Sequence, residues 1–285
     1  MQRRSKSSPG GSGGLAHVLP EGALTAPDGR WSDFWTRFWS AAILGPVALA
    51  ALCWGGPAWL ALMLLQLAVL GYEWGNLAGL GKTSWLPAGL VGSACAAVLF
   101  GFFGGFMVLA AVTLFVKRRH GNFAAAGLPY AGICGLSLIW LRNQPGHGLE
   151  DTLFLVMVVW GTDIGAYAVG RVLGGKKLAP KISPGKTWSG GIGGFLAGGL
   201  TGAAVALFLH GNPLTAGLAA AVLSVVAQAG DLLESAIKRH LGVKDSGDTI
   251  PGHGGLFDRV DGFLTAAPVA ALFLVVTQGG VPLWP

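Results

Sequence analysis

The chain has 285 residues, of which 52% are hydrophobic and only 11% are charged, with a formal net charge of +6. Soluble proteins carry about 25% charged residues, so this composition excludes an ordinary soluble domain. It predicts an all-α polytopic membrane protein, and the 48 glycines and 11 tryptophans fit that class. The three cysteines, Cys53, Cys95 and Cys134, lie singly in apolar runs and match no zinc-binding pattern.

Apolar segments of spanning or nearly spanning length recur along the whole chain after a basic, Ser/Gly-rich tail at residues 1–35. We expect the tail to be disordered. The segments predict about nine transmembrane helices, at residues 36–55, 58–74, 86–100, 101–116, 122–141, 151–170, 191–211, 214–239 and 263–281. The third and fourth are short and contiguous, so a count of eight remains an alternative. Residues 36–145 would form an N-terminal region of about five helices. Residues 146–285 would form a C-terminal region with polar loops at 171–190 and 240–262.

The positive charges predict the orientation of these helices, because cytoplasmic loops are enriched in Lys and Arg. With nine spans and a cytoplasmic N-terminus, 18 of the 19 Lys and Arg residues fall inside and only Arg142 falls outside. The sequence therefore predicts a multi-pass protein of the inner (cytoplasmic) membrane, with its C-terminus outside and both polar loops facing the cytoplasm. The positive charges form no aromatic-interleaved patch, so we expect no nucleic acid partner.

Ionisable side chains within spans indicate function, because their burial in a bilayer is costly. Asp163, Tyr167 and Arg171 follow helical spacing and predict one stripe that descends toward the cytoplasm. Glu73, at the end of the second span, is a weaker candidate, since it could instead reach the interface beside Trp74.

A second group of polar residues ends the span at 214–239. Asp231, Ser235 and Lys238 are spaced i, i+4 and i+7, and Glu234 and Arg239 flank the same face. The alternative is that Asp231 and Lys238 only neutralise each other where helices pack.

The first polar loop contains a Gly-Lys-Thr sequence, but Pro180 stands where a P-loop requires glycine, so a P-loop is excluded. Its lysines and the hydroxyls of Ser183 and Thr187 still suit a polyphosphate, with positive-inside charge as the alternative reading. The lysines are Lys176, Lys177, Lys181 and Lys186. The glycine-rich segment 190–199 that follows favours close helix packing over a nucleotide loop.

In the second polar loop, Asp258 and Asp261 would share a face if the segment is helical. Together with Asp231 they could hold Mg²⁺, which prefers a few carboxylates plus phosphate oxygens. His253 could contact a phosphate or be structural. A basic loop, an acidic cluster and a membrane together predict magnesium-dependent phosphoryl or nucleotidyl transfer at the cytoplasmic face. A cation-coupled transporter, with Asp163 and Asp231 as cation ligands, is the alternative from another class, although no internal repeat supports it.

Residues 235–262, SAIKRHLGVKDSGDTIPGHGGLFDRVDG, resemble the signature of the phosphatidate cytidylyltransferases, also called CDP-diacylglycerol synthases. The matching positions are Ser235, Lys238, Arg239, Lys244, Asp245, Gly247, Pro251, His253, Gly254, Gly255, Asp258, Arg259 and Asp261. Two upstream segments, GTDIGAYAVGR and KLAPKISPGKTWSGG, resemble further blocks of the family in the same order. Gly262 departs from the serine often found there, and Asp248 falls on a variable position and is expected to be solvated.

The resemblance implies that CTP and phosphatidic acid are the substrates and that CDP-diacylglycerol and pyrophosphate are the products. It implies a cofactor, Mg²⁺ or another divalent cation, with a second cation left open, and it implies Asp231 and Asp258 as metal ligands. Asp231, Asp258, Lys238 and Arg239 are the expected catalytic residues. The expected substrate-binding residues are Ser183, Lys186, Thr187, Ser235, Lys244, Asp245, His253, Arg259, Asp163 and Asp261. A related CTP-dependent transferase acting on another lipid phosphate remains an alternative, and a homodimer is left open.

Overall fold

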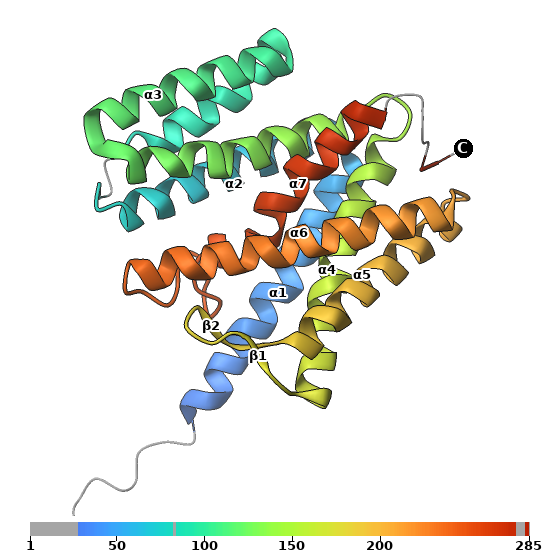
Figure 1. Ribbon diagram of the computed structural model, residues 1–285. Helices are drawn as coiled ribbons and strands as arrows, with labels where there is room; N and C mark the ends of the chain where they lie inside the picture. The colour runs from blue at the N-terminus through green and yellow to red at the C-terminus, as the bar shows by residue number, and fades with distance from the viewer. Residues whose placement is uncertain (1–27, 82–83, 278–282, 285) are drawn as a thin grey trace, which may run out of the picture.

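The computed structural model describes residues 28–81, 84–277 and 283–284 (Figure 1). Of the tail predicted at residues 1–35, residues 1–27 lie outside the described residues. The elements in chain order are α1 (Asp28–Trp54), α2 (Gly56–Leu77), α3 (Leu86–Arg142), α4 (Gly148–Leu173), β1 (Lys177–Ala179), β2 (Ser183–Thr187), α5 (Trp188–Phe208), α6 (Pro213–His240) and α7 (Phe257–Thr277). Six helices of the described part, α2 to α7, are long and apolar enough to cross a membrane. An all-α polytopic membrane protein is therefore confirmed as the fold class.

Helix α3 contains two backbone breaks, at Gly101 and Gly121, where φ is +77° and +88°. Such values favour glycine because it lacks a Cβ. The chain folds back at both positions, since Gly89 faces Val112 and Gly132 contacts both Leu109 and Leu90. The breaks divide α3 at the boundaries expected from hydropathy, so the segments at 86–100 and 101–116 are separate helical stretches.

Two helix boundaries differ from the sequence-based expectation. Helix α1 begins at Asp28, within the segment expected to be a disordered tail up to residue 35. Helix α7 begins at Phe257 rather than near residue 263, so Asp258, Arg259 and Asp261 belong to a helix and not to the preceding loop. In both places polar residues at a helix start resemble a loop when only hydropathy is considered.

The C-terminal region is built around α5, which packs against α4 on one side and α6 on the other. The glycines predicted to allow close packing do so. A Cβ at Gly198 would lie 2.5 Å from Thr162 Oγ1 of α4 and 2.7 Å from Ser224 Cβ of α6. Ser224 Oγ also donates to Gly194 O at 3.0 Å. Helix α7 packs against α6 and α3, which connects this region to the N-terminal helices.

Local sequence explains where several helices begin. Asn212 caps α6 by accepting hydrogen bonds from the amides of Leu214 and Thr215 at 3.0 and 3.2 Å. Thr187 caps α5 by accepting from the Gly190 amide at 3.1 Å. Proline occupies the first turn of α2, α3 and α6, where its missing N–H costs no helical hydrogen bond.

Candidate functional site

The polar segments of the C-terminal region gather at one end of the helices, where the end of α6 and the start of α7 lie near the β1–β2 hairpin (Figure 1). Ser40 of α1 donates to Pro251 O at 2.8 Å, which brings α1 to the same end. The end of α2 is there as well, because Glu73 reaches the segment between α6 and α7.

Asp258, in the first turn of α7, has both carboxylate oxygens engaged. Oδ1 accepts from Lys238 Nζ, and Oδ2 accepts from Ser246 N and Oγ at 2.9 Å each and from Gly255 N at 3.0 Å. Lys238 Nζ also lies 2.8 Å from Glu234 Oε2. The Lys238 and Asp258 side chains are only 12% and 6% exposed, so this ion pair is largely desolvated. It fixes the end of α6 against the start of α7.

A second ion pair joins the hairpin to α6. Lys186 Nζ of β2 lies 2.5 Å from Asp231 Oδ2, and these side chains are 27% and 32% exposed. Ser235, one turn further along α6, places its Oγ 3.5 Å from Asp231 Oδ1. Among the described residues, Asp231 is paired with Lys186, and Lys238 is paired with Glu234 and Asp258, so each of the two has a partner other than the one considered from the sequence.

The predicted stripe on α4 is present, because Arg171 Nη1 donates to Tyr167 Oη at 2.8 Å. Asp163, two turns earlier, is exposed. Asp163 and Asp231 both lie close enough to Asp261 to interact with it electrostatically. Three of the predicted acids, from α4, α6 and α7, thus lie at the same end of the helices.

Some of the remaining predicted residues make hydrogen bonds within the protein, and others have exposed or half-buried side chains. Arg239 donates to Ile182 O at 3.2 Å and to Val243 O at 2.9 Å, and so ties the hairpin to α6. The Thr187 hydroxyl is used as the α5 cap, whereas Ser183 is half-buried at the other end of β2. The side chains of Lys244, Asp245 and Arg259 are exposed. His253 is half-buried, and its Nδ1 has no hydrogen-bond partner among the residues that the structure describes.

The structure also brings in Ser246 and Tyr130, which the sequence reasoning passed over, and Glu73, which it ranked as a weaker candidate. Ser246 contacts Asp258 directly, and Glu73 accepts hydrogen bonds from the segment before α7. Tyr130 of α3 stacks on Phe257 with ring centroids 6.0 Å apart, and its hydroxyl is buried without a partner in the described part of the chain. The only sequence signal was the unusual presence of a carboxylate and a tyrosine within apolar segments.

Whether a divalent cation fits can be judged from the acids themselves. No group of three or more His, Cys, Asp or Glu side chains in residues 28–81, 84–277 and 283–284 is arranged to hold a metal ion. Mg²⁺, however, needs only one or two carboxylates when phosphates supply other ligands. The Asp231 carboxylate is partly exposed and could serve as such a ligand if Lys186, which is paired with its Oδ2, moved to a phosphate. Asp258 has both oxygens occupied by protein donors and would have to release one of them.

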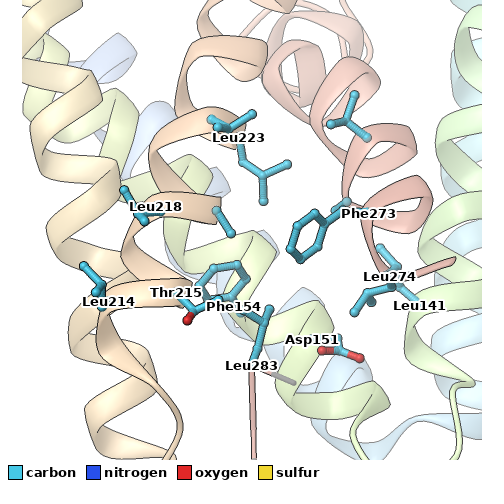
Figure 2. Close-up of a pocket in the computed structure, with 14 residues that line it drawn as sticks. Leu141, Asp151, Phe154, Leu214, Thr215, Leu218, Leu223, Phe273, Leu274 and Leu283 are labelled. Atoms are coloured by element: carbon cyan, nitrogen blue, oxygen red, sulfur yellow. The ribbon is translucent and has the colours of Figure 1, made fainter. Parts of the chain in front are cut away.

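A cavity of about 370 Å³ lies at the other end of the helices (Figure 2). Its walls come from the start of α6, including Leu214 and Leu218, and from the second half of α7, including Phe273. The Asp151 carboxylate in this cavity already accepts a hydrogen bond from Trp284 Nε1 at 2.7 Å. The described lining is mostly apolar, suits hydrocarbon and contains no Lys or Arg for a triphosphate, which separates the cavity from the polar site.

Comparison with known proteins agrees with the chemistry of the polar end. The phosphatidate cytidylyltransferase of Brucella melitensis is 41% identical to this chain over 256 residues, which cover 85% of this chain and 93% of that protein. That of Brucella suis is 40% identical over 257 residues, with the same coverage. That of Staphylococcus epidermidis is 41% identical over 174 residues, covering 60% of this chain and 67% of that protein. The model of the cytidylyltransferase family matches residues 35–277, and the chain belongs to this family.

Proposed function

We propose that this protein transfers the cytidylyl group of CTP to phosphatidate, which yields CDP-diacylglycerol and pyrophosphate for phospholipid synthesis. The observation that carries the proposal is the 40–41% identity to phosphatidate cytidylyltransferases over 85% of the chain. The paired acidic and basic side chains at one end of membrane-spanning helices suit a reaction between a soluble triphosphate and a lipid phosphate.

The reaction needs no protein base, because the phosphate of phosphatidate is already ionised near neutral pH. Its oxygen attacks the α-phosphorus of CTP and forms the new P–O bond. The bond from that phosphorus to the oxygen bridging to the β-phosphorus breaks, and pyrophosphate leaves with the electron pair. The contribution of the protein is to position the two phosphates and to stabilise their charge.

The basic residues of the site carry that contribution. Lys186 and Lys238 are each held by carboxylates, which fix the ammonium groups before a phosphate arrives. Arg239, Lys244 and Arg259 add positive charge at the same end. Further substrate contacts are proposed for Ser183, Thr187, Ser235, His253, Asp163, Asp245 and Asp261.

We propose Asp231 as a ligand of Mg²⁺ or another divalent cation, since its carboxylate is partly exposed and lies near Asp261. Asp258 is proposed as the second ligand, reached by exchange of one of its hydrogen bonds. When bound there, a divalent cation would supply positive charge that stabilises the phosphate oxygens.

We further propose nine spans in the inner (cytoplasmic) membrane, with the site on the cytoplasmic side, the N-terminus inside and the C-terminus outside. Lys117, Arg118 and Arg119 precede the break at Gly121, and Trp74 Nε1 donates to Phe123 O at 3.2 Å beside the site end. Arg142 lies at the opposite end, where it donates to Leu52 O at 2.7 Å. This distribution supports the positive-inside orientation. A homodimer stays a prediction.

The test is to supply purified protein in detergent with labelled CTP, Mg²⁺ and phosphatidate and to follow label into the lipid phase. Formation of CDP-diacylglycerol supports the proposal. Failure with phosphatidate but success with an isoprenoid phosphate would assign a different lipid substrate. Cation flux in vesicles without any CDP-lipid would instead favour the transporter alternative.

A further inference from the structure

Glu73, the buried carboxylate near the end of α2, accepts hydrogen bonds from four groups of the segment that precedes and begins α7. Oε1 accepts from Leu256 N at 2.6 Å and from the Thr249 hydroxyl. Oε2 accepts from Phe257 N at 2.9 Å and from Ser246 Oγ at 3.1 Å. The residue is only 1% exposed, so these donors stand in place of the water that a carboxylate would otherwise need.

Two of the four donors are backbone amides at the N-terminus of α7. Amides there have no partner within their own helix, and they present partial positive charge. A helix usually obtains a cap from a residue just before it in the chain. Here the cap comes from a different helix, 183 and 184 residues away in the sequence. The start of α7 is therefore fixed relative to α2 and not only relative to its own loop.

The same carboxylate is linked to the ion pair of the site through one side chain. Ser246 Oγ lies 3.1 Å from Glu73 Oε2 and 2.9 Å from Asp258 Oδ2. A Cβ at Gly255 would lie 2.8 Å from Glu73 Oε2 and would overlap Ser246 Oγ, so only glycine leaves room for this contact. Asp258 in turn holds Lys238.

Trp74, the next residue of α2, adds an apolar contact to the same element. Its ring packs on that of Phe257, with centroids 5.7 Å apart. Two consecutive residues of α2 thus hold the first residue of α7, one through hydrogen bonds to its amide and the other through its ring.

From this geometry we infer that Glu73 is a positioning residue for cytidylyl transfer, acting through Ser246 and the start of α7 on Asp258 and Lys238. This inference rests on the proposed function. It gives the N-terminal helices a role in catalysis, because Glu73, which positions Asp258 and Lys238, belongs to α2.

The experiment compares Glu73→Gln, Ser246→Ala and the double variant with the unmodified protein in detergent. Glutamine keeps the size of the side chain but turns an NH₂ group toward two of the four donors. Asp151→Asn is the matched control, since it also neutralises a buried carboxylate of a spanning helix but lies at the opposite end. Two readouts are taken, namely kcat and KM for both substrates, and hydrogen–deuterium exchange of the peptide covering residues 246–257.

In Glu73→Gln we expect kcat to fall about tenfold or more, the scale of one lost hydrogen bond to a charged group. The KM values should stay within about threefold, because the substrate contacts themselves remain. Exchange at residues 246–257 should be faster in this variant and unchanged in Asp151→Asn. The kcat of the double variant should be at most about threefold below that of the less active single variant, because both substitutions interrupt the same chain of hydrogen bonds.

Unchanged exchange at residues 246–257, or faster exchange with kcat unaffected, would overturn the inference. If Glu73→Gln does not fold, Ser246→Ala decides the matter, since it keeps both bonds from Glu73 to the α7 amides. Ser246→Ala must then lower kcat by about threefold or more at an unchanged melting temperature, on the scale of one hydrogen bond. If the unmodified protein forms no CDP-lipid, the proposed function fails instead, and the exchange comparison still reports on the position of the segment.

Discussion

The substitution Asp258→Asn tests an acid of the candidate site that has both carboxylate oxygens engaged. An amide has one oxygen where the carboxylate has two, and an NH₂ group takes the place of the other. If the oxygen turns to Lys238, the NH₂ group faces the amides of Ser246 and Gly255, both of which are donors. If it turns the other way, the NH₂ group faces the Lys238 ammonium. Either orientation leaves donors opposed to donors in a largely buried place.

The expected magnitude follows from that count. Each lost hydrogen bond to a charged acceptor is worth about 1.5–3 kcal/mol. Losing one electrostatic stabiliser of this kind costs about 2.7–4 kcal/mol in activation free energy, a factor of about 10² to 10³ in kcat. We therefore expect Asp258→Asn to lower kcat at least about a hundredfold on this scale.

The assay is CDP-diacylglycerol formation by purified protein, with thermal unfolding in detergent measured beside it. Asp248→Asn is the control, because it makes the same chemical change at an exposed aspartate of the neighbouring loop. A kcat for Asp258→Asn within a few-fold of the unmodified protein would refute the assignment of Asp258 to the reacting end.

Lys186→Met keeps the length of the side chain but removes its charge, and should raise KM for CTP about tenfold. Lys186→Arg should restore part of the affinity. An unaltered KM in steady-state kinetics would exclude Lys186 from triphosphate binding. Chelation of divalent cations should abolish CDP-lipid formation, and Mg²⁺ should restore it; turnover that persists in excess chelator contradicts the metal proposal. Gly198→Ala should lower the melting temperature relative to Gly199→Ala. A Cβ at 198 would lie 2.5 Å from Thr162 Oγ1, whereas one at 199 would have its nearest neighbour at 3.4 Å. Equal melting temperatures for the two variants would contradict the close packing of α5.

The helical framework could be predicted from the sequence because long apolar segments must form helices in a bilayer, where every backbone polar group needs an internal partner. Hydropathy even located the divisions of α3, since Gly101 and Gly121 fall where the apolar segments were separated. It failed at the start of α7, because Asp258, Arg259 and Asp261 give the first turns of this helix a polar composition. When composition alone is considered, charged residues in the first turns of a helix are assigned to a loop.

The sequence named most residues of the candidate site but did not predict which of them form ion pairs with each other. Spacing suggested that Asp231 and Lys238 share a face of one helix, which is a local property. Their partners, Lys186 and Asp258, come from other elements. Glu73 was underrated for the same reason, since its donors lie 173 to 184 residues further along the chain and leave no periodic signal.

The contacts of Glu73 also constrain when the helices can reach their final packing during synthesis of the chain. At a synthesis rate of about 5–20 residues per second, the donors of the α7 start are made on the order of ten to forty seconds after Glu73 itself. During that interval the carboxylate at the end of α2 lacks the four groups that surround it in the finished protein. The N-terminal helices therefore cannot reach their final state at this end alone. The end of α2 and the start of α7 therefore reach their final contacts together, once residues 246–257 have been made.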